Sequence, residues 1–371
     1  MTTRAISITY VGPYPPIRGG ISQHGYQLVR ALHDRGATVN VISWRAQYPR
    51  PLYRGSQVPI PPRNDTHSLK WWSPVSWLKA RLAVKDSDLL VVPYVSPVQV
   101  LPLRAILAGA QGCSIAIVHN AIPHERLPFS RTCLRLLLRH VDGVIVHSQV
   151  VADQIRSMSI DTPVSVIPHP PNLDLQQEPL PDGPPRALFF GYIRPYKGVD
   201  LLIEAIAELR ESGTNLRVTI AGEPWTDPTE LIRLAEQRGV DDLIDFQLGY
   251  LPDQQVGALL ARHHLVIQPY RSATQSGVIP LAFAAGRGVV VTPVGGLGEA
   301  VEDGVNGFIT SDVSSHALAE AITRAIDNLV KLTAGARGSA ASWGDLADII
   351  LQILESGNGG TSRSRETPPT T

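Results

Sequence analysis

Two cations three positions apart are the residues of this sequence best suited to chemistry. Arg194 and Lys197 lie in the segment Phe-Gly-Tyr-Ile-Arg-Pro-Tyr-Lys-Gly at 190–198, between an apolar run at 187–190 and a helical pattern at 201–209. Loops between a strand and a helix bind phosphates in α/β proteins, because backbone N–H groups and the helix dipole point there. Two cations on such a loop suit a ligand with two phosphates. An ordinary charged surface loop is the alternative.

A second anion-binding turn is expected farther along the chain. A strand leads into a small polar turn and then into a helix of small residues over 278–285. Four residues fall at the N-terminus of that helix: Gln275, Ser276 and, through their amides, Gly277 and Val278. Helix N-termini favour anions, so this turn predicts a second phosphate contact. A plain strand–helix connection is the alternative.

The first half of the chain offers two further candidate positions. Gly19 and Gly20 follow the first expected strand and precede a helix, where glycine lets backbone N–H groups approach a ligand closely. A tight turn is the alternative there. His119 ends another strand, where it can hydrogen-bond a sugar or share a proton. His124 lies nearby and competes for that role, and a structural histidine is the other interpretation.

No group of residues has the spacing of metal ligands. Asp86 and Asp88 form the best carboxylate pair, but they precede a strand, whereas ligands of open α/β sheets bind at the carboxyl ends of strands. We therefore expect a solvated turn there and no metal site.

Composition favours a soluble protein of two domains. The chain has 371 residues, 43% of them hydrophobic, and a mean hydropathy near zero. Cys113 and Cys133 have neither metal nor disulfide spacing, which fits a reducing cytoplasm. The first apolar run is too short for a signal peptide, and no apolar run is long enough to cross a membrane.

Charge is distributed unevenly between the two halves. Residues 1–170 hold 18 Lys and Arg against 8 Asp and Glu, whereas the remainder holds 15 against 25. No nucleic-acid-binding module is recognisable, so we expect no nucleic acid partner. The segments 70–85 and 126–140 mix bulky apolar residues with Lys and Arg at helical spacing. This pattern predicts helices that contact an anionic membrane surface, and ordinary core helices are the alternative.

Strands and helices alternate along both halves, which predicts two Rossmann-like α/β domains with parallel sheets. The N-terminal domain is expected over 1–170 and the C-terminal domain over 186–340, joined by a proline-rich hinge at 171–185. A helix over 341–355 is expected to return to the N-terminal domain, and 356–371 to form a disordered tail. Strands are expected over 5–11, 38–44, 89–94, 114–119, 143–147, 164–168, 187–190, 217–221, 244–246, 265–269 and 289–292.

With these residues together, the chain resembles the family 4 glycosyltransferases, which have the GT-B fold. The resemblance covers nearly the whole length. It rests on Gly19-Gly20, on His119 and on the segments at 190–205 and 294–301. It implies retaining, metal-independent transfer without a cofactor. The C-terminal domain would bind a nucleotide sugar and the N-terminal domain an acceptor, across a cleft between them.

The resemblance also implies roles for individual residues. Arg194 and Lys197 match the pair that grips the donor diphosphate, Gly20 would approach it from the other domain, and His119 would contact the donor sugar. We assign Gly191 and Glu223 to the donor site as well.

Two positions depart from the family pattern. The family carries two glutamates eight residues apart, which contact the sugar and the ribose, and this chain has Ala273 and Leu281 there. We expect a hexosyltransferase that uses a nucleotide-diphosphate sugar and a glycan or polyprenol-linked acceptor in cell-surface polysaccharide or glycolipid synthesis. It would work in the cytoplasm, on the inner face of the plasma membrane. The alternatives are a non-catalytic GT-B subunit of a membrane glycan-assembly complex and, less favoured, a GT-B epimerase.

Overall fold

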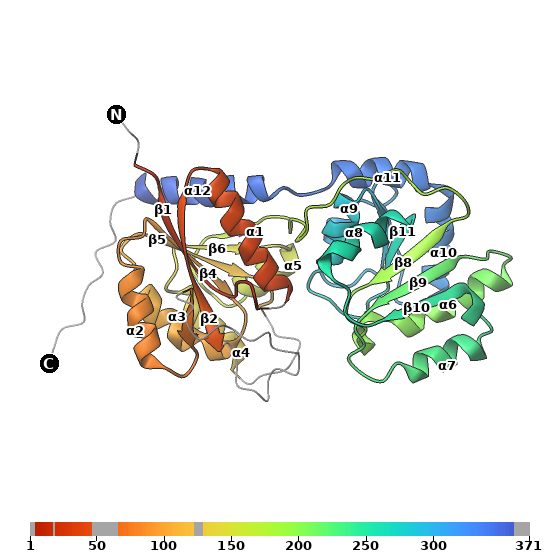
Figure 1. Cartoon of the computed structure of the whole chain (residues 1–371), viewed down its shortest axis with the longest axis horizontal. Helices are drawn as coiled ribbons and strands as arrows, with labels where there is room; N and C mark the ends of the chain where they lie inside the picture. The colour runs from red at the N-terminus through yellow and green to blue at the C-terminus, as the bar shows by residue number, and fades with distance from the viewer. Residues whose placement is uncertain (1–3, 18, 47–65, 122–128, 360–371) are drawn as a thin grey trace. The chain divides into compact units, whose positions relative to one another are not determined.

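The computed structural model describes residues 4–17, 19–46, 66–121 and 129–359, and it divides the chain into two compact units (Figure 1). Unit 1 comprises residues 1–146, 152–167 and 343–371, and unit 2 comprises residues 147–151 and 168–342. Each unit is a parallel sheet with helices packed on it, so the expected fold class of two Rossmann-like α/β domains is confirmed.

Unit 1 is built on a seven-stranded sheet in the order β3-β2-β1-β4-β5-β6-β7, with every pairing parallel. Its central strands are continuous apolar runs because a parallel sheet is covered on both faces. The strands are β1 Ser7–Val11, β2 Thr38–Ala46, β3 His67–Lys70, β4 Leu89–Tyr94, β5 Cys113–Val118, β6 Gly143–Val146 and β7 Val164–Val166. The helices in this part of the fold are α1 Gly20–Asp34, α2 Pro74–Ala83, α3 Val100–Leu107, α4 Ser130–Leu138, α5 Gln149–Arg156 and α12 Trp343–Gly359.

The last helix, α12, completes unit 1 by packing on α1 (Figure 1). Its apolar face enters the unit 1 core through Leu346, Ala347, Ile350 and Leu354. The helix extends four residues beyond the predicted end at 355, since its hydrogen bonding continues and the Ser356 hydroxyl donates to the Gln352 carbonyl. The predicted disordered tail was therefore wrong for 356–359, and 360–371 lie outside the described residues.

Unit 2 is built on a six-stranded parallel sheet in the order β10-β9-β8-β11-β12-β13. The strands are β8 Arg186–Phe190, β9 Arg217–Gly222, β10 Ile244–Leu248, β11 Leu265–Gln268, β12 Gly288–Val291 and β13 Gly307–Ile309. The helices are α6 Val199–Glu211, α7 Thr229–Gln237, α8 Asp253–Ala261, α9 Val278–Ala284, α10 Ser315–Asp327 and α11 Leu329–Gly338. In this order β8 is central, so the loops after β8, β9 and β11 lie side by side at one edge of the sheet.

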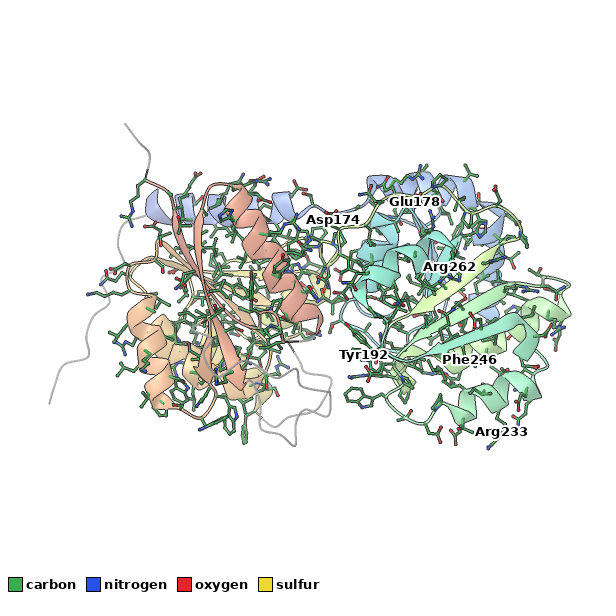
Figure 2. The ribbon with its side chains drawn as sticks, in the orientation of Figure 1. Asp174, Glu178, Tyr192, Arg233, Phe246 and Arg262 are labelled. Atoms are coloured by element: carbon green, nitrogen blue, oxygen red, sulfur yellow. The ribbon has the colours of Figure 1, made fainter. Side chains whose placement is uncertain are left out.

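The proline-rich segment predicted as a hinge is partly anchored on unit 2. Arg287 is fully buried, and its guanidinium donates to the carbonyl oxygens of Glu178 and Pro179 at 2.8 Å each and to that of Leu260 at 3.1 Å. Leu175 packs against the same core, and Figure 2 labels Glu178. Residues 175–179 therefore belong to unit 2 rather than to a free linker.

None of the helices in the described part of the chain combines the length and apolar character needed to span a bilayer.

Candidate functional site

The loop that carries the two cations is fixed by backbone pairing to the loop after the neighbouring strand. Ile193 N–H donates to the Glu223 carbonyl, and Trp225 N–H donates to the Ile193 carbonyl, both at 2.9 Å. Gly222 permits this approach, because a Cβ added there would lie 1.9 Å from the Gly191 carbonyl oxygen. The loops after β8 and β9 thus form one rigid rim at the carboxyl edge of the unit 2 sheet.

Lys197 ends a short 3₁₀ turn that packs against the end of β11. The following Gly198 has φ +66°, and a Cβ there would lie 2.0 Å from the Pro269 carbonyl oxygen, so only glycine fits. This packing leaves Lys197 half-buried, with its ammonium 5.1 Å from the centroid of the Tyr270 ring. Burial, aided by the nearby Arg194 charge, lowers the pKa of Lys197 to about 8.

Lys197 also lies beside two other residues predicted for the donor site. A Cβ added to Gly191, which has φ +118°, would lie 3.1 Å from Lys197 Nζ and 3.7 Å from the Val278 side chain. Gly191 therefore leaves room next to the ammonium, where any side chain would crowd it. The structure brings Gly191, Lys197 and Val278 together although they are separated by up to 87 positions in the chain.

Arg194 is oriented by aromatic side chains. Its guanidinium carbon lies 3.9 Å from the Trp225 ring centroid and 5.8 Å from that of Tyr192, which Figure 2 labels. Stacking on an aromatic face holds the guanidinium plane while leaving its N–H groups available at the edge. Sequence reasoning missed Trp225. Its position just after a strand next to β8 was the available signal.

The two cations differ from a nearby arginine in their charge partners. Within the described residues, neither Arg194 nor Lys197 forms an ion pair, whereas the nearby Arg271 is held by Asp200 through two hydrogen bonds of 2.6 and 2.8 Å. A buried ammonium without a counter-ion is costly, and a bound anion would remove that cost. The rim therefore offers positive charge that suits an anion.

The turn before α9 differs in part from the prediction. The Ser276 hydroxyl accepts a hydrogen bond from Val278 N–H at 3.2 Å and donates to Gln268 Oε1 at 3.1 Å. The Val278 amide is thus already capped from within the turn and is not available to an anion as expected. Gly277 is the N-cap residue of α9, and Gln275 lies half-buried in the same turn.

Two family models match the chain. The model described as Glycosyltransferase Family 4 covers residues 18–175, and the model described as Glycosyl transferases group 1 covers residues 184–328. The chain belongs to the family 4 glycosyltransferases. The matches fall on the two halves that carry the Gly19-Gly20 segment and the Arg194–Lys197 loop, respectively.

Individual relatives agree with this membership. A protein of Actinosynnema mirum named D-inositol 3-phosphate glycosyltransferase is 32% identical over 218 residues, which is 51% of this chain and 50% of that relative. The match thus spans half the relative's length. Sucrose-phosphate synthase from Thermosynechococcus elongatus has a TM-score of 0.74 at 18% identity, covering 95% of this chain and 98% of that one. Anabaena HepE in complex with UDP-glucose has a TM-score of 0.62 at 17% identity, with the same coverage. These two structures show the shared fold.

This family 4 member lacks carboxylates at both positions where the family resemblance places them. Leu281 is 6% exposed and lies in the unit 2 core on α9, and Ala273 packs against that core. A leucine side chain offers no hydrogen-bonding atom in place of the glutamate carboxylate. The exposed Glu223, which follows β9, is the carboxylate that the sequence placed near this rim.

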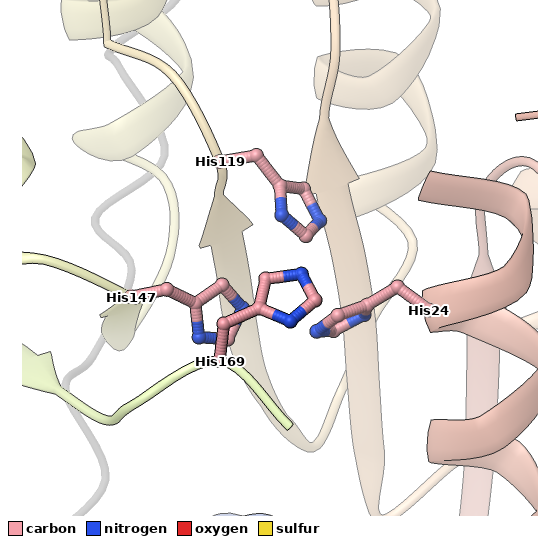
Figure 3. A group of neighbouring side chains, drawn as sticks. All are labelled: His24, His119, His147 and His169. Atoms are coloured by element: carbon pink, nitrogen blue, oxygen red, sulfur yellow. The ribbon is translucent and has the colours of Figure 1, made fainter. Parts of the chain in front are cut away.

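Unit 1 carries the other predicted residues. Gly19, with φ +128°, is the N-cap residue of α1, and Gly20 is the first residue of that helix. His119 directly follows β5, and its ring meets that of His24 edge-to-face at 4.6 Å (Figure 3). His24 in turn contacts the ring of Trp343 on α12 at 4.8 Å. Packing therefore fixes the orientation of the His119 ring.

Sequence reasoning did not consider His24, although its place one turn into α1 after the two glycines was the available signal. The competing His124 lies outside the described residues.

Unit 2 carries a second histidine pair. His147 and His169 have ring centroids 4.8 Å apart (Figure 3). Burial lowers the pKa of His169 to about 4, and one of its ring nitrogens lies 2.6 Å from the Pro170 carbonyl oxygen. Burial therefore keeps the His169 imidazole neutral at physiological pH.

Proposed function

We propose that this protein transfers a hexose from a nucleotide-diphosphate sugar to a glycan or lipid-linked acceptor, in the synthesis of cell-surface polysaccharide or glycolipid. The observation that carries the proposal is the half-buried Lys197 ammonium, which has no carboxylate partner among the described residues, beside an Arg194 guanidinium stacked on Trp225. Two fixed cations on one rim complement the charge of a diphosphate.

The chemistry proposed for this rim is neutralisation of the leaving group. The bond between the anomeric carbon and the donor oxygen breaks, and the nucleoside diphosphate leaves with the electron pair. Arg194 and Lys197 stabilise the charge that develops on its phosphates, and they need no reorganisation to do so. The acceptor hydroxyl attacks the same face, which retains the configuration, and its proton passes to the departing phosphate oxygen. In this proposal the transfer needs no metal ion, and His119 contacts the donor sugar.

Different relatives suggest the donor and the acceptor. HepE in complex with UDP-glucose makes UDP-glucose the first donor to test. The name of the Actinosynnema mirum relative makes D-inositol 3-phosphate a soluble acceptor to test beside lipid-linked glycans. We place the reaction in the cytoplasm, because Cys113 and Cys133 are both free.

Thermal stabilisation by ligands tests the donor site directly. Purified protein is screened with UDP, GDP and ADP and with their hexose conjugates, since a ligand that binds the native state raises its melting temperature. The Arg194→Ala/Lys197→Ala double variant should lose the shift. The Arg238→Ala variant should keep it, because Arg238 forms a surface ion pair with Glu204. A shift that persists in the double variant would refute the assignment.

Transfer assays follow with the donor that binds. The double variant should turn over at least about 100-fold more slowly, which corresponds to about 3 kcal/mol of lost transition-state stabilisation.

A non-catalytic subunit with the same fold is the second candidate function, and the specific observation behind it is Leu281 in the core at a family glutamate position. Such a subunit would bind a nucleotide sugar, and mutation of Arg194 and Lys197 would abolish binding. It would neither transfer nor hydrolyse the sugar with any acceptor supplied. Binding without turnover therefore separates the two functions.

A further inference from the structure

Helix α2 exposes an apolar face. Val75, Leu78 and Leu82 are 66%, 57% and 66% exposed, and their spacing of three and four residues places them on one side of the helix. Trp72, just before the helix, is 53% exposed. Single exposed leucines are ordinary on protein surfaces, but a row of them with a tryptophan at its end marks an interaction site.

The chain fixes α2 with this face outward. The opposite side of the helix packs inward through Trp77, Ala80 and Val84. Trp77 Nε1 donates a hydrogen bond of 2.8 Å to the Lys70 carbonyl, and the Ser73 hydroxyl caps the helix by accepting from Ser76 N–H. Rolling α2 to bury its leucines would break these bonds. The exposure is therefore built into the fold.

The neighbouring helix α3 also carries an exposed apolar residue. It packs against α2, and a Cβ added to Gly109 just after α3 would lie 2.4 Å from the Arg81 carbonyl oxygen. Leu101 on α3 is 67% exposed. We define the α2 face as the side chains of Trp72, Val75, Leu78 and Leu82.

The surroundings of the α2 face are basic. Residues 70–85 contain four Lys and Arg and no Asp or Glu. Lys79 lies four residues after Val75 and three before Leu82, on the same side of the helix as both. In the part of the chain that the structure describes, no carboxylate pairs with Lys79, Arg81 or Lys85. The partner of this face must therefore accept apolar side chains and positive charge together.

The other basic segment flagged from the sequence behaves differently. In α4 the leucines at 134, 137 and 138 are fully buried and pack inward, whereas Leu136 is 38% exposed. We therefore consider α2 alone as a membrane contact below, and residues 126–128 of the other segment lie outside the described part.

We propose that the α2 face docks on the surface of an anionic lipid bilayer. Its leucines, valine and tryptophan would enter the boundary between head groups and acyl chains, while Lys79, Arg81 and Lys85 meet the anionic head groups. An exposed tryptophan favours this boundary, because its ring is apolar and its N–H is polar. The charge favours lipid over an apolar protein groove, since each cation near an anionic surface strengthens binding about fivefold.

Flotation with lipid vesicles tests the proposal independently of the proposed transfer reaction. The full chain is incubated with phosphatidylcholine vesicles, with and without phosphatidylglycerol, and the bound fraction is measured. The wild type should float with the anionic vesicles and much less with the neutral ones. Leu78→Gln/Leu82→Gln should bind the anionic vesicles at least about tenfold more weakly, because two leucines no longer leave water. Lys79→Gln/Lys85→Gln should also bind more weakly, and added salt should weaken the wild type.

Val330→Gln is the matched control, because Val330 is an exposed apolar residue on α11 in the other unit and should leave flotation unchanged. Circular dichroism and melting temperature should be the same for all variants, since the replaced side chains lie on the surface. The proposal fails if the wild type does not float with anionic vesicles, or if the leucine variant floats as well as the wild type. It also fails if that variant instead abolishes self-association of the purified protein, which would make the face a contact between copies.

Discussion

Nucleoside diphosphate binding should weaken as pH rises through 8. Burial lowers the pKa of Lys197 to about 8, so the ammonium that would meet the diphosphate is lost just above neutral pH. A bound diphosphate favours the charged form and raises that pKa again, which couples binding to proton uptake. Nucleotide affinity is therefore highest below pH 8, where Lys197 is charged, and it falls as the pH rises through 8.

The magnitude follows from the fraction of charged lysine. With a pKa near 8, about ten in eleven molecules carry the ammonium at pH 7 and about one in eleven at pH 9. If the neutral amine contributes little, affinity falls about tenfold over this interval, or about 1.4 kcal/mol. At pH 8, binding should take up about half a proton per ligand.

Isothermal titration calorimetry measures both quantities. The dissociation constant is determined between pH 7 and 9, and proton uptake is obtained from two buffers with different ionisation enthalpies. Lys197→Arg is the control, because a guanidinium stays charged throughout and should remove both the slope and the proton uptake. This control also cancels any titration of the nucleotide itself. Affinity that stays constant from pH 7 to 9 in the wild type, or an equal slope in Lys197→Arg, would refute the reasoning.

Three further substitutions test residues that hold the structure of unit 2 in place. Trp225→Ala should raise the dissociation constant of the nucleotide about three- to tenfold by releasing Arg194, while Trp225→Phe keeps most of the affinity; equal binding by both variants would exclude the stacking role. Gly198→Ala should lower the free energy of unfolding by about 2 kcal/mol or more, measured by urea denaturation, because its Cβ collides with the Pro269 carbonyl. Arg287→Met should lower it by about 2 to 4 kcal/mol because buried carbonyl groups lose their donor, and an unchanged urea midpoint would contradict this.

Sequence patterns predicted most strands of the two sheets but missed two of the four edge strands. The apolar runs that became β4, β8 and β12 were recognisable because buried parallel strands are continuously apolar. The edge strands β3 and β13 were missed, since each is short and β3 is mostly polar. Such strands are defined by pairing with a neighbour, which local sequence does not encode.

In the candidate site, too, local sequence predicted some residues, whereas others depend on contacts formed only in the folded chain. Arg194, Lys197 and the flanking glycines were predictable because local spacing places them on one loop after one strand. Trp225 and the capping of Val278 by Ser276 were not predicted. The first depends on contact between two loops, and the second on hydrogen-bond geometry within a turn. The burial of Leu281 depends on which face of α9 meets the core.

The position of α12 has a consequence for synthesis of the protein on the ribosome. Unit 1 begins with the first strand, yet its core includes Leu346, Ile350 and Leu354 from the last helix. All of unit 2 lies between these parts of the chain. Unit 2 therefore leaves the ribosome complete while the face of unit 1 that α12 covers is still open to water. During that interval the uncovered apolar face of unit 1 is available to a chaperone. Helix α12 covers this face once the helix has emerged.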